Sequence, residues 1–174
     1  MLPMPMIRCT RRLQKAVGIR VDEPTNPESS ASVLGDWFAN LIEPGEDQCV
    51  IFVNDRTFIN FVIDFRSAET ASSLISSFLL GLSCILSELG TPKDTKERLL
   101  SDYGDISFGN TNDHRIVGTM NQLAFEYTFM ITDVGGIHSP EVPAIMLRAN
   151  RTPVKPLNWQ FPVEALQALY QSVK

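Results

Sequence analysis

Three apolar runs joined by two short turns constrain the fold more than any other part of the chain. Each run is rich in Val, Ile and Phe, a composition that is typical of β-strands. The turns contain Pro-Gly and Asn-Asp, which favour tight reversals of the chain. Strands that follow one another through short turns pair antiparallel, so this block predicts a meander sheet. The expected strands are Trp37–Ile42, Cys49–Asn54 and Phe58–Asp64.

The last of these runs, Phe58–Asp64, is apolar on both faces. A strand with this pattern is usually buried on both sides. We therefore expect it to lie centrally in the sheet and to be covered by helices.

Apolar residues at helical spacing predict the covering helices. Residues 68–89 carry two apolar stripes that together wrap much of the helix surface, so this helix is expected to be the buried one. Three serines near one face are expected to permit tight packing on the sheet: Ser76, Ser83 and Ser87. Further helices are predicted at 11–17, 92–103, 114–131 and from 161 onward, with short strands at 6–10 and 105–110.

No internal repeat and no shift in composition divides the 174 residues. We expect a single domain over residues 1–174, with residues 22–32 and 135–158 rich in loops. The predicted fold class is α+β. An antiparallel meander sheet is expected to pack against a buried helix and further helices, in two layers.

The overall charge is acidic, and the basic residues are unevenly placed. The formal net charge is −5. We therefore do not expect non-specific nucleic-acid binding, because that affinity comes from many Lys and Arg side chains. Residues 7–20 nevertheless contain five basic side chains and no acid. This segment is either the solvated face of a short helix or a small anion-binding patch.

The three cysteines, Cys9, Cys49 and Cys84, are far apart and lie within apolar patterns. We expect buried, reduced thiols and a cytoplasmic location. The first residues lack the apolar run of a signal peptide, and residues 74–86 are shorter than a membrane span, so no membrane association is expected. Neither histidine has a metal-ligand spacing, and no phosphate-binding loop or dinucleotide fingerprint is present, so we expect no metal and no cofactor.

The start of the predicted helix 114–131 is the first candidate site. Asp113 precedes this helix and Arg115 lies in its first turn. Free N–H groups at a helix N-terminus, together with Arg115, could hold a phosphate or a carboxylate. The alternative is a cap made by Asp113 beside a surface arginine. Asn121 is a poor helix former, which suggests a hydrogen bond to another segment.

The meander carries the second candidate site. Alternation along the first strand places Asp36, Phe38 and Asn40 on one face, so the two polar residues would flank the aromatic ring. The alternative is structural: Asp36 turns the chain, and Asn54 and Asp55 form a hairpin.

Four motifs follow one another in a fixed order. They are Arg8-Cys9-Thr10 before a basic pair and Leu13; Leu34-Gly35-Asp36-Trp37-Phe38-Ala39-Asn40-Leu41; Cys49 to Asn54 followed by Thr57; and Arg115-x-x-Gly118-Thr119-Met120-Asn121. This order resembles an uncharacterised bacterial family of domains of unknown function over about residues 6–131. Phe38 and Gln122 depart from the pattern, which has Tyr and Asp at those positions.

The resemblance implies a single-domain bacterial cytosolic protein and supplies no activity. Polar residues within the four motifs are the candidates for ligand binding: Arg8, Thr10, Asp36, Asn40, Asn54, Thr57, Arg115 and Asn121.

Arg, Asn, Asp and Thr without a strong nucleophile favour recognition over covalent chemistry. The first hypothesis is a soluble binding or interaction module for an anionic ligand or a protein partner. The second is an enzyme acting on a phosphorylated or nucleotide-like substrate, with Arg8 and Arg115 holding phosphate and Asp36 as general base. The third is an accessory or regulatory protein of a mobile element or toxin system. On either ligand hypothesis, Arg8 and Arg115 are expected to lie near each other.

Overall fold

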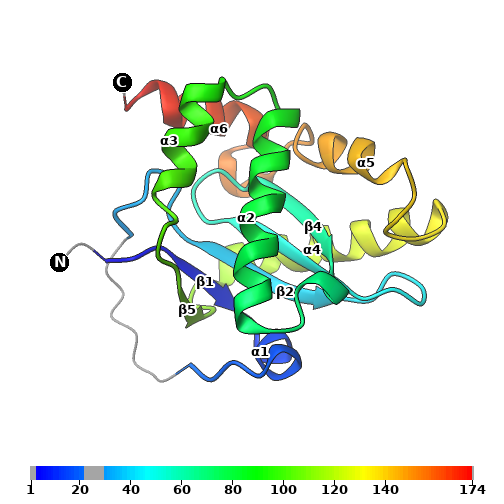
Figure 1. The fold of residues 1–174 in the computed structure, drawn as a ribbon. Coiled ribbons are helices and arrows are strands. Elements are labelled where there is room, and N and C mark those ends of the chain that lie inside the picture. The colour runs from blue at the N-terminus through cyan, green and yellow to red at the C-terminus, as the bar shows by residue number, and fades with distance from the viewer. Residues whose placement is uncertain (1–2, 22–29, 174) are drawn as a thin grey trace.

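The computed structural model describes residues 3–21 and 30–173, which fold around one five-stranded sheet (Figure 1). The strand order is β4-β3-β2-β1-β5. The predicted meander is confirmed, because β2 pairs antiparallel with β3, and β3 pairs antiparallel with β4. The strands are β1 Met6–Cys9, β2 Trp37–Ile42, β3 Cys49–Asn54, β4 Asn60–Asp64 and β5 Ser107–Asn110.

The sheet is mixed rather than purely antiparallel, which corrects the sequence-based prediction. β1 pairs parallel with both β2 and β5. A parallel pair needs a long crossover connection, and the segment between β1 and β2 begins with a helix and spans 27 residues, from Thr10 to Asp36. The pattern of each strand could not reveal this pairing, because it depends on the connection.

β4 lies at the edge of the sheet, so the prediction of a central position was wrong. Its apolar pattern has another cause: helices cover this strand on both faces, although only one side of it is hydrogen-bonded to a strand.

The helices begin and end close to the predicted positions. Their bounds are α1 Arg11–Val17, α2 Ala71–Glu88, α3 Lys93–Ser101, α4 His114–Asp133, α5 Val142–Ala149 and α6 Pro162–Gln171, with 3-10 turns η1 Phe65–Ser67 and η2 Lys155–Leu157. α5 and η2 lie inside 135–158, the segment predicted to be rich in loops. Proline lies in the first turn of both, where its missing N–H costs no helical hydrogen bond, so these prolines start helices rather than break them. Within the predicted loop 22–32, residues 22–29 lie outside the described residues.

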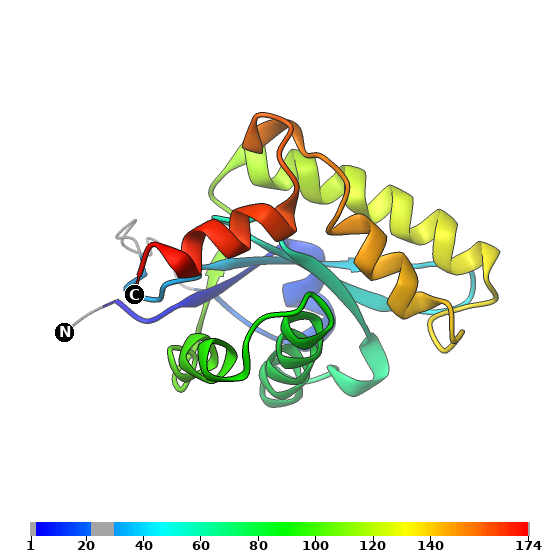
Figure 2. The same cartoon turned by 90° about the horizontal axis from the view of Figure 1, so that it is seen from above.

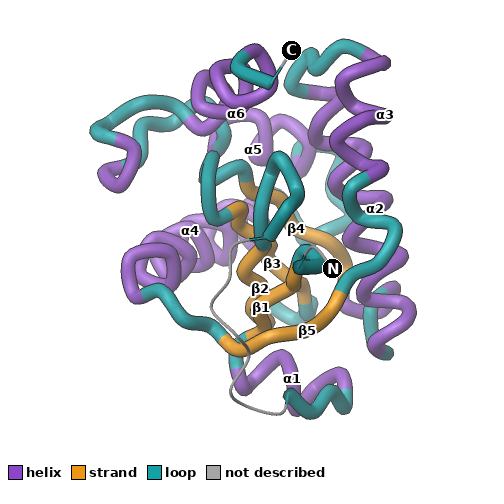
Figure 3. The backbone as a smooth tube through the Cα atoms, turned by 90° about the vertical axis from the view of Figure 1, so that its left-hand side faces the viewer, coloured by secondary structure: helices purple, strands orange, loops and turns teal. Residues whose placement is uncertain are grey.

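Helices cover both faces of the sheet, so the fold has three layers rather than the two predicted (Figures 2 and 3). Along β2, Trp37 and Ala39 face one core while Phe38 and Ile42 face the other. The first core also contains residues of α1, α2, α3 and α6, and the second contains residues of α4 and α5. Both faces of these strands are apolar, and each face requires its own cover.

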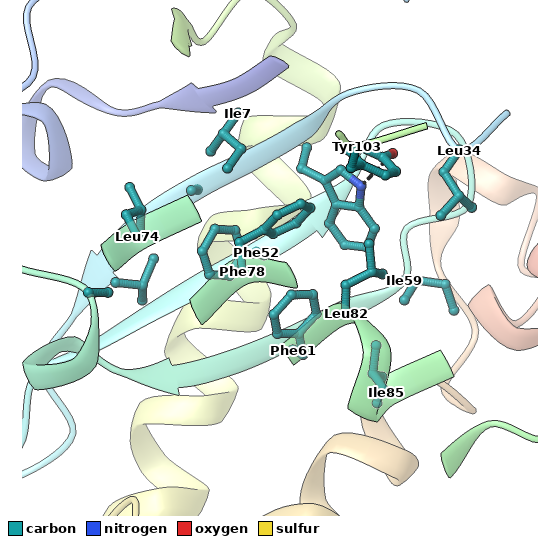
Figure 4. Close-up of a cluster of buried hydrophobic side chains, with 14 of the residues drawn as sticks. Ile7, Leu34, Phe52, Ile59, Phe61, Leu74, Phe78, Leu82, Ile85 and Tyr103 are labelled. Atoms are coloured by element: carbon teal, nitrogen blue, oxygen red, sulfur yellow. Dashed lines mark hydrogen bonds between the residues drawn. The ribbon is translucent and has the colours of Figure 1, made fainter. Parts of the chain in front are cut away.

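Aromatic rings fill the first core (Figure 4). Phe78 of α2 is fully buried, and its ring lies 5.4 Å from the ring of Trp37, 5.2 Å from Phe52 and 5.7 Å from Tyr103. Gly81 allows the close approach of α2 to the sheet, because a Cβ there would lie 2.5 Å from the Phe61 ring.

The prediction that serines allow this close packing was wrong. Ser76 and Ser87 are exposed, and only one face of α2 is buried, with Leu80 pointing to solvent. The length and hydropathy of α2 alone would suit a membrane span, but its buried face packs on the sheet. This packing is consistent with a water-soluble domain.

Candidate functional site

Arg8 and Asp36 form a buried ion pair at the end of the sheet. The Arg8 Nε donates to Asp36 Oδ2 at 3.1 Å, and Arg8 Nη1 donates to the Asn110 carbonyl at 3.2 Å. Asp36 Oδ1 accepts from the Met6 main-chain N–H at 2.9 Å. The side chains of Arg8 and Asp36 are only 5 % and 8 % exposed. The pair therefore links β1, β2 and β5. Because each charge is already neutralised by the other, neither group is available to bind a charged ligand.

Thr10 and Asn40 form a second pair, at the start of α1. The Thr10 hydroxyl donates to Asn40 Oδ1 at 2.7 Å and accepts from the Leu13 N–H as the N-cap of the helix. Asn40 and Phe38 do lie on the same face of β2, as predicted from alternation, since Trp37, Ala39 and Leu41 belong to the opposite core. This contact anchors α1 to the sheet.

Asn54 and Thr57 form a third pair, inside the β3–β4 turn. Asn54 Oδ1 accepts from the Thr57 N–H and hydroxyl, both at 2.8 Å, while Asn54 Nδ2 donates to the Leu34 carbonyl. Asn54 has no exposed surface. These contacts fit the structural alternative, in which Asn54 forms part of the hairpin turn.

Asp113 caps α4, so the end of this helix is already occupied by a carboxylate. Asp113 Oδ1 accepts from the main-chain N–H groups of Arg115 and Ile116. The predicted role of these N–H groups in holding an anion has no support in this geometry. Asn121, on the outer face of α4, is exposed, and no hydrogen bond joins its side chain to another described segment.

Arg115 lies in a groove between α4 and the turn formed by residues 152–159. The groove has a volume of about 390 Å³. Among the described residues, its lining includes Arg115 and none of the other seven predicted site residues. One wall is a face of α4, and the other is the 152–159 turn, which closes through a bridge between Val154 and Gln160. The α4 wall consists of His114, Arg115, Gly118, Thr119, Gln122, Leu123 and Glu126.

Trp159 lies at this groove in an unusual backbone conformation. Its φ is +65°, and that of the preceding Asn158 is +53°. A left-handed conformation is rare for a bulky side chain and costs about 1–3 kcal/mol. Trp159 is nonetheless 65 % exposed, so burial of its ring does not offset this cost. The turn holds an indole at the mouth of the groove.

The groove brings cationic and polar groups together around this indole. Arg115 and Lys155 line it from opposite walls, with His114 beside them. The Arg115 guanidinium lies 5.8 Å from the centre of the Phe58 ring, and its side chain is 57 % exposed. Glu126 is the one acid in the described lining, and Gln122 donates to it at 3.3 Å. The arrangement can bind an anion and offer a flat ring surface.

Sequence reasoning identified Arg115 but missed Lys155 and Trp159. Both lie in the segment assigned to loops. One signal was available: a large aromatic residue follows a Pro- and Asn-containing run that has no helical or strand periodicity. A tryptophan in such a loop has no core face to explain it.

A shifted pKa marks a separate polar position. Burial, together with the neighbouring Asp36 carboxylate, raises the pKa of Asp55 to about 7. Asp55 Oδ1 accepts from the Asp36 main-chain N–H at 3.1 Å. Burial also raises the pKa of the Cys9 and Cys49 thiols to about 12.

Cys84 is exposed, which corrects the expectation that all three thiols are buried, and all three cysteines are free thiols. Among residues 3–21 and 30–173, no group of three or more His, Cys, Asp or Glu side chains is placed to hold a metal ion.

The family comparison agrees with the resemblance noted from the motifs. Residues 6–165 match the model of a domain of unknown function, DUF6933. The chain belongs to this family. The DUF6933 match includes all five strands, helices α1–α5, and the groove with Trp159. No curated protein matches the chain. The function of this DUF6933 domain is therefore argued from its geometry.

Proposed function

We propose that this protein is a binding module for a small anionic ligand that carries a flat ring, such as a nucleoside monophosphate. The ligand binds in the groove between α4 and the 152–159 turn. The observation that carries the proposal is Trp159, an exposed indole held at this groove by a backbone that is unfavourable for tryptophan.

The strained turn supports a binding role because strain of this kind persists where the surrounding structure maintains it, and it clusters at ligand sites. An exposed tryptophan contributes little to folding. The same indole can stack on a nucleobase, an interaction worth about 1–3 kcal/mol per base.

The charges of the groove support an anion. Lys155 and Arg115 provide positive charge in a protein whose net charge is −5; Arg115 forms only a long, exposed pair with Asp113, at 3.9 Å. A guanidinium binds phosphate through paired N–H donors, and an ammonium adds a point charge. Local cations in an acidic protein concentrate an anion at one place. The volume of about 390 Å³ falls within the range of small-molecule sites, about 300–1,000 Å³.

This proposal keeps the predicted anionic ligand and Arg115 but moves the site. Arg8 and Asp36 stabilise the sheet through a buried pair, and Arg115 works with Lys155 and Trp159 instead. Glu126 and Gln122 offer an acceptor and a donor at the other end of the α4 wall, where the polar edge of a ring could bind.

Trp159 itself provides the test. The chain has two tryptophans, and Trp37 is fully buried, so an added ligand that stacks in the groove changes the fluorescence of Trp159. Titration of adenosine 5′-monophosphate is expected to quench this emission in a saturable manner. Inorganic phosphate is expected to compete weakly because it lacks the ring.

Variants identify the groove as the binding site. Arg115→Ala and Lys155→Ala are each expected to weaken binding by about tenfold, the magnitude of a hydrogen bond to a charged group. Arg151→Ala is the matched control, because Arg151 is exposed beside the same turn but does not line the groove. Equal affinity in all three variants, or no saturable binding by the wild type, would contradict the proposal.

A further inference from the structure

The outer edge of β4 has main-chain groups without a strand partner. β4 pairs only with β3, through a register that joins Phe61 to Phe52 and Val62 to Ile51. In an antiparallel pair, alternate residues turn their N–H and C=O groups away from the partner strand. The Ile59 carbonyl accepts from the Asn54 N–H, and the Phe65 N–H donates to the Gln48 carbonyl, so the odd-numbered residues of this segment face β3. Asn60, Val62 and Asp64 therefore direct their main-chain groups outward.

Asn150 closes one end of this edge. Its side chain accepts from the Asn60 N–H at 2.9 Å and donates to the Asn60 carbonyl at 2.8 Å, as the backbone of a neighbouring strand would. No residue of the described chain does the same for Val62. The main-chain groups of Val62 and the Asp64 N–H remain as a short open edge.

The open edge lies in a large apolar groove. The groove has a volume of about 630 Å³ and runs between α2 and α5 along residues 61–64. Leu80, Gly81 and Cys84 of α2 form one wall. Val142, Pro143 and Met146 of α5 form the other, continued by residues 137–140. This groove is separate from the one that contains Trp159, with which it shares no lining residue.

We propose that this edge binds an extended peptide segment of another protein, which adds to the sheet as a sixth strand beside β4. An extended chain supplies main-chain donors and acceptors for Val62 and Asp64, and its alternate side chains enter the apolar walls. Strand addition of this type combines main-chain hydrogen bonds for affinity with side-chain pockets for specificity.

The groove selects a single strand rather than a second copy of this protein. The edge is recessed between α2 and α5, and the β4 edge of a second copy is recessed between its own two helices. The four helices would meet before the two edges could pair. A lone extended segment has no such obstacle.

The charges of the groove indicate a basic residue in that segment. Asp64 lies at one end of the groove, paired with His138 at 2.8 Å and Arg66 at 3.4 Å. α2 runs back along β4, with Gly81 against Phe61, so Glu88, which follows seven residues later and also lines the groove, lies toward the opposite end. Glu88 forms no ion pair within the described residues. A Lys or Arg of the bound segment complements this exposed carboxylate.

Cys84 makes occupancy measurable. It lies in the groove wall and is exposed, whereas Cys9 and Cys49 are at most 1 % exposed. The probe is a random dodecapeptide displayed on phage and selected against the full chain, then made as a synthetic peptide. A selected peptide is expected to slow alkylation of Cys84 by N-ethylmaleimide by about tenfold or more. The matched control carries Cys84→Ser and Ser76→Cys, which moves the thiol to an exposed position on α2 outside the groove and should show no protection.

Peptide N-methylation tests strand addition directly. Methyl groups on alternate peptide nitrogens are expected to weaken binding by about tenfold each, while methyl groups on the intervening nitrogens have little effect. Glu88→Gln should weaken peptides with Lys or Arg by up to about fivefold, and Glu97→Gln, an exposed acid of α3, should not. A library without binders, bound peptides that leave Cys84 unprotected, or an N-methyl scan without alternation would overturn the proposal.

Discussion

Asn150 binds Asn60 through both ends of its side-chain amide: Oδ1 accepts from the Asn60 main-chain N–H at 2.9 Å, and Nδ2 donates to the Asn60 carbonyl at 2.8 Å. Both residues are fully buried. Asn150 follows α5, and its own carbonyl accepts from the N–H of Val163 in α6. One residue thus joins the C-terminal helices to the edge of a sheet built from the first 110 residues, through its side chain at β4 and its main-chain carbonyl at α6.

Asn150→Ala is expected to lower the free energy of unfolding by about 2–5 kcal/mol, because it leaves a buried N–H and a buried carbonyl without partners. Urea denaturation measures the change. Asn121→Ala is the matched control, since Asn121 is an exposed asparagine of α4 and alanine is the better helix former. The control should be as stable as the wild type or slightly more stable. A similar result for Asn150→Ala would mean that the edge contact contributes nothing.

Arg8→Met is expected to destabilise the protein by about 3–5 kcal/mol, because the Asp36 carboxylate would then be buried without its counter-charge. The cost should be smaller when Asp36→Asn is already present, since asparagine is neutral and its oxygen can still accept from Met6. A double-mutant cycle in urea measures the difference. Additive effects would show that the two side chains do not act as a pair.

Stability is expected to fall as the pH rises toward 7, because of Asp55. Burial, with the Asp36 carboxylate nearby, raises the pKa of Asp55 to about 7 in the folded protein, against an ordinary value of 3.8. Between these values the folded state keeps a proton that the unfolded state releases, so the stabilisation is present at low pH and is lost through pH 7.

Asp55→Asn should therefore show a smaller loss of stability between pH 5 and pH 8 than the wild type. Urea denaturation at both pH values gives the comparison. Asp94→Asn, at an exposed position of α3, is the control and should retain the wild-type slope. An unchanged slope in Asp55→Asn would show that this carboxyl titrates normally.

Phe78→Ala is expected to cost about 3–5 kcal/mol, because it opens a cavity between α2 and the rings of Trp37, Phe52 and Tyr103. The comparison is Leu80→Ala on the same helix, since Leu80 is 69 % exposed. Thermal or chemical denaturation should separate the two by more than 2 kcal/mol. Equal effects would place Phe78 outside the core.

The position of most elements could be predicted because local chemistry determines it. The turn at 43–48 and the cap at Asp113 lie where the residue types indicated. The arrangement of the elements depends on long connections. No local pattern shows that β1 pairs parallel with strands that follow it by 28 and about 100 residues, or that β4 forms an edge.

The candidate site was harder to predict for a related reason. Polar residues of the ordered motifs form buried pairs in the structure: Arg8 pairs with Asp36, and Asn54 with Thr57. Lys155 and Trp159 lie across the groove from Arg115, about 40 residues away in sequence. Their relation to it exists only after α5 and the 152–159 turn have packed against α4.

A nucleotide-like anion is proposed to bind between α4 and the 152–159 turn. The most direct measurement is an amide NMR titration of the full chain with adenosine 5′-monophosphate. The predicted result is a saturable set of shifts confined to residues 114–126 and 149–159, together with movement of the Trp159 indole N–H and none of the Trp37 indole N–H. Saturable shifts centred on Arg8 and Asp36, or no shifts in these two segments, would contradict the account.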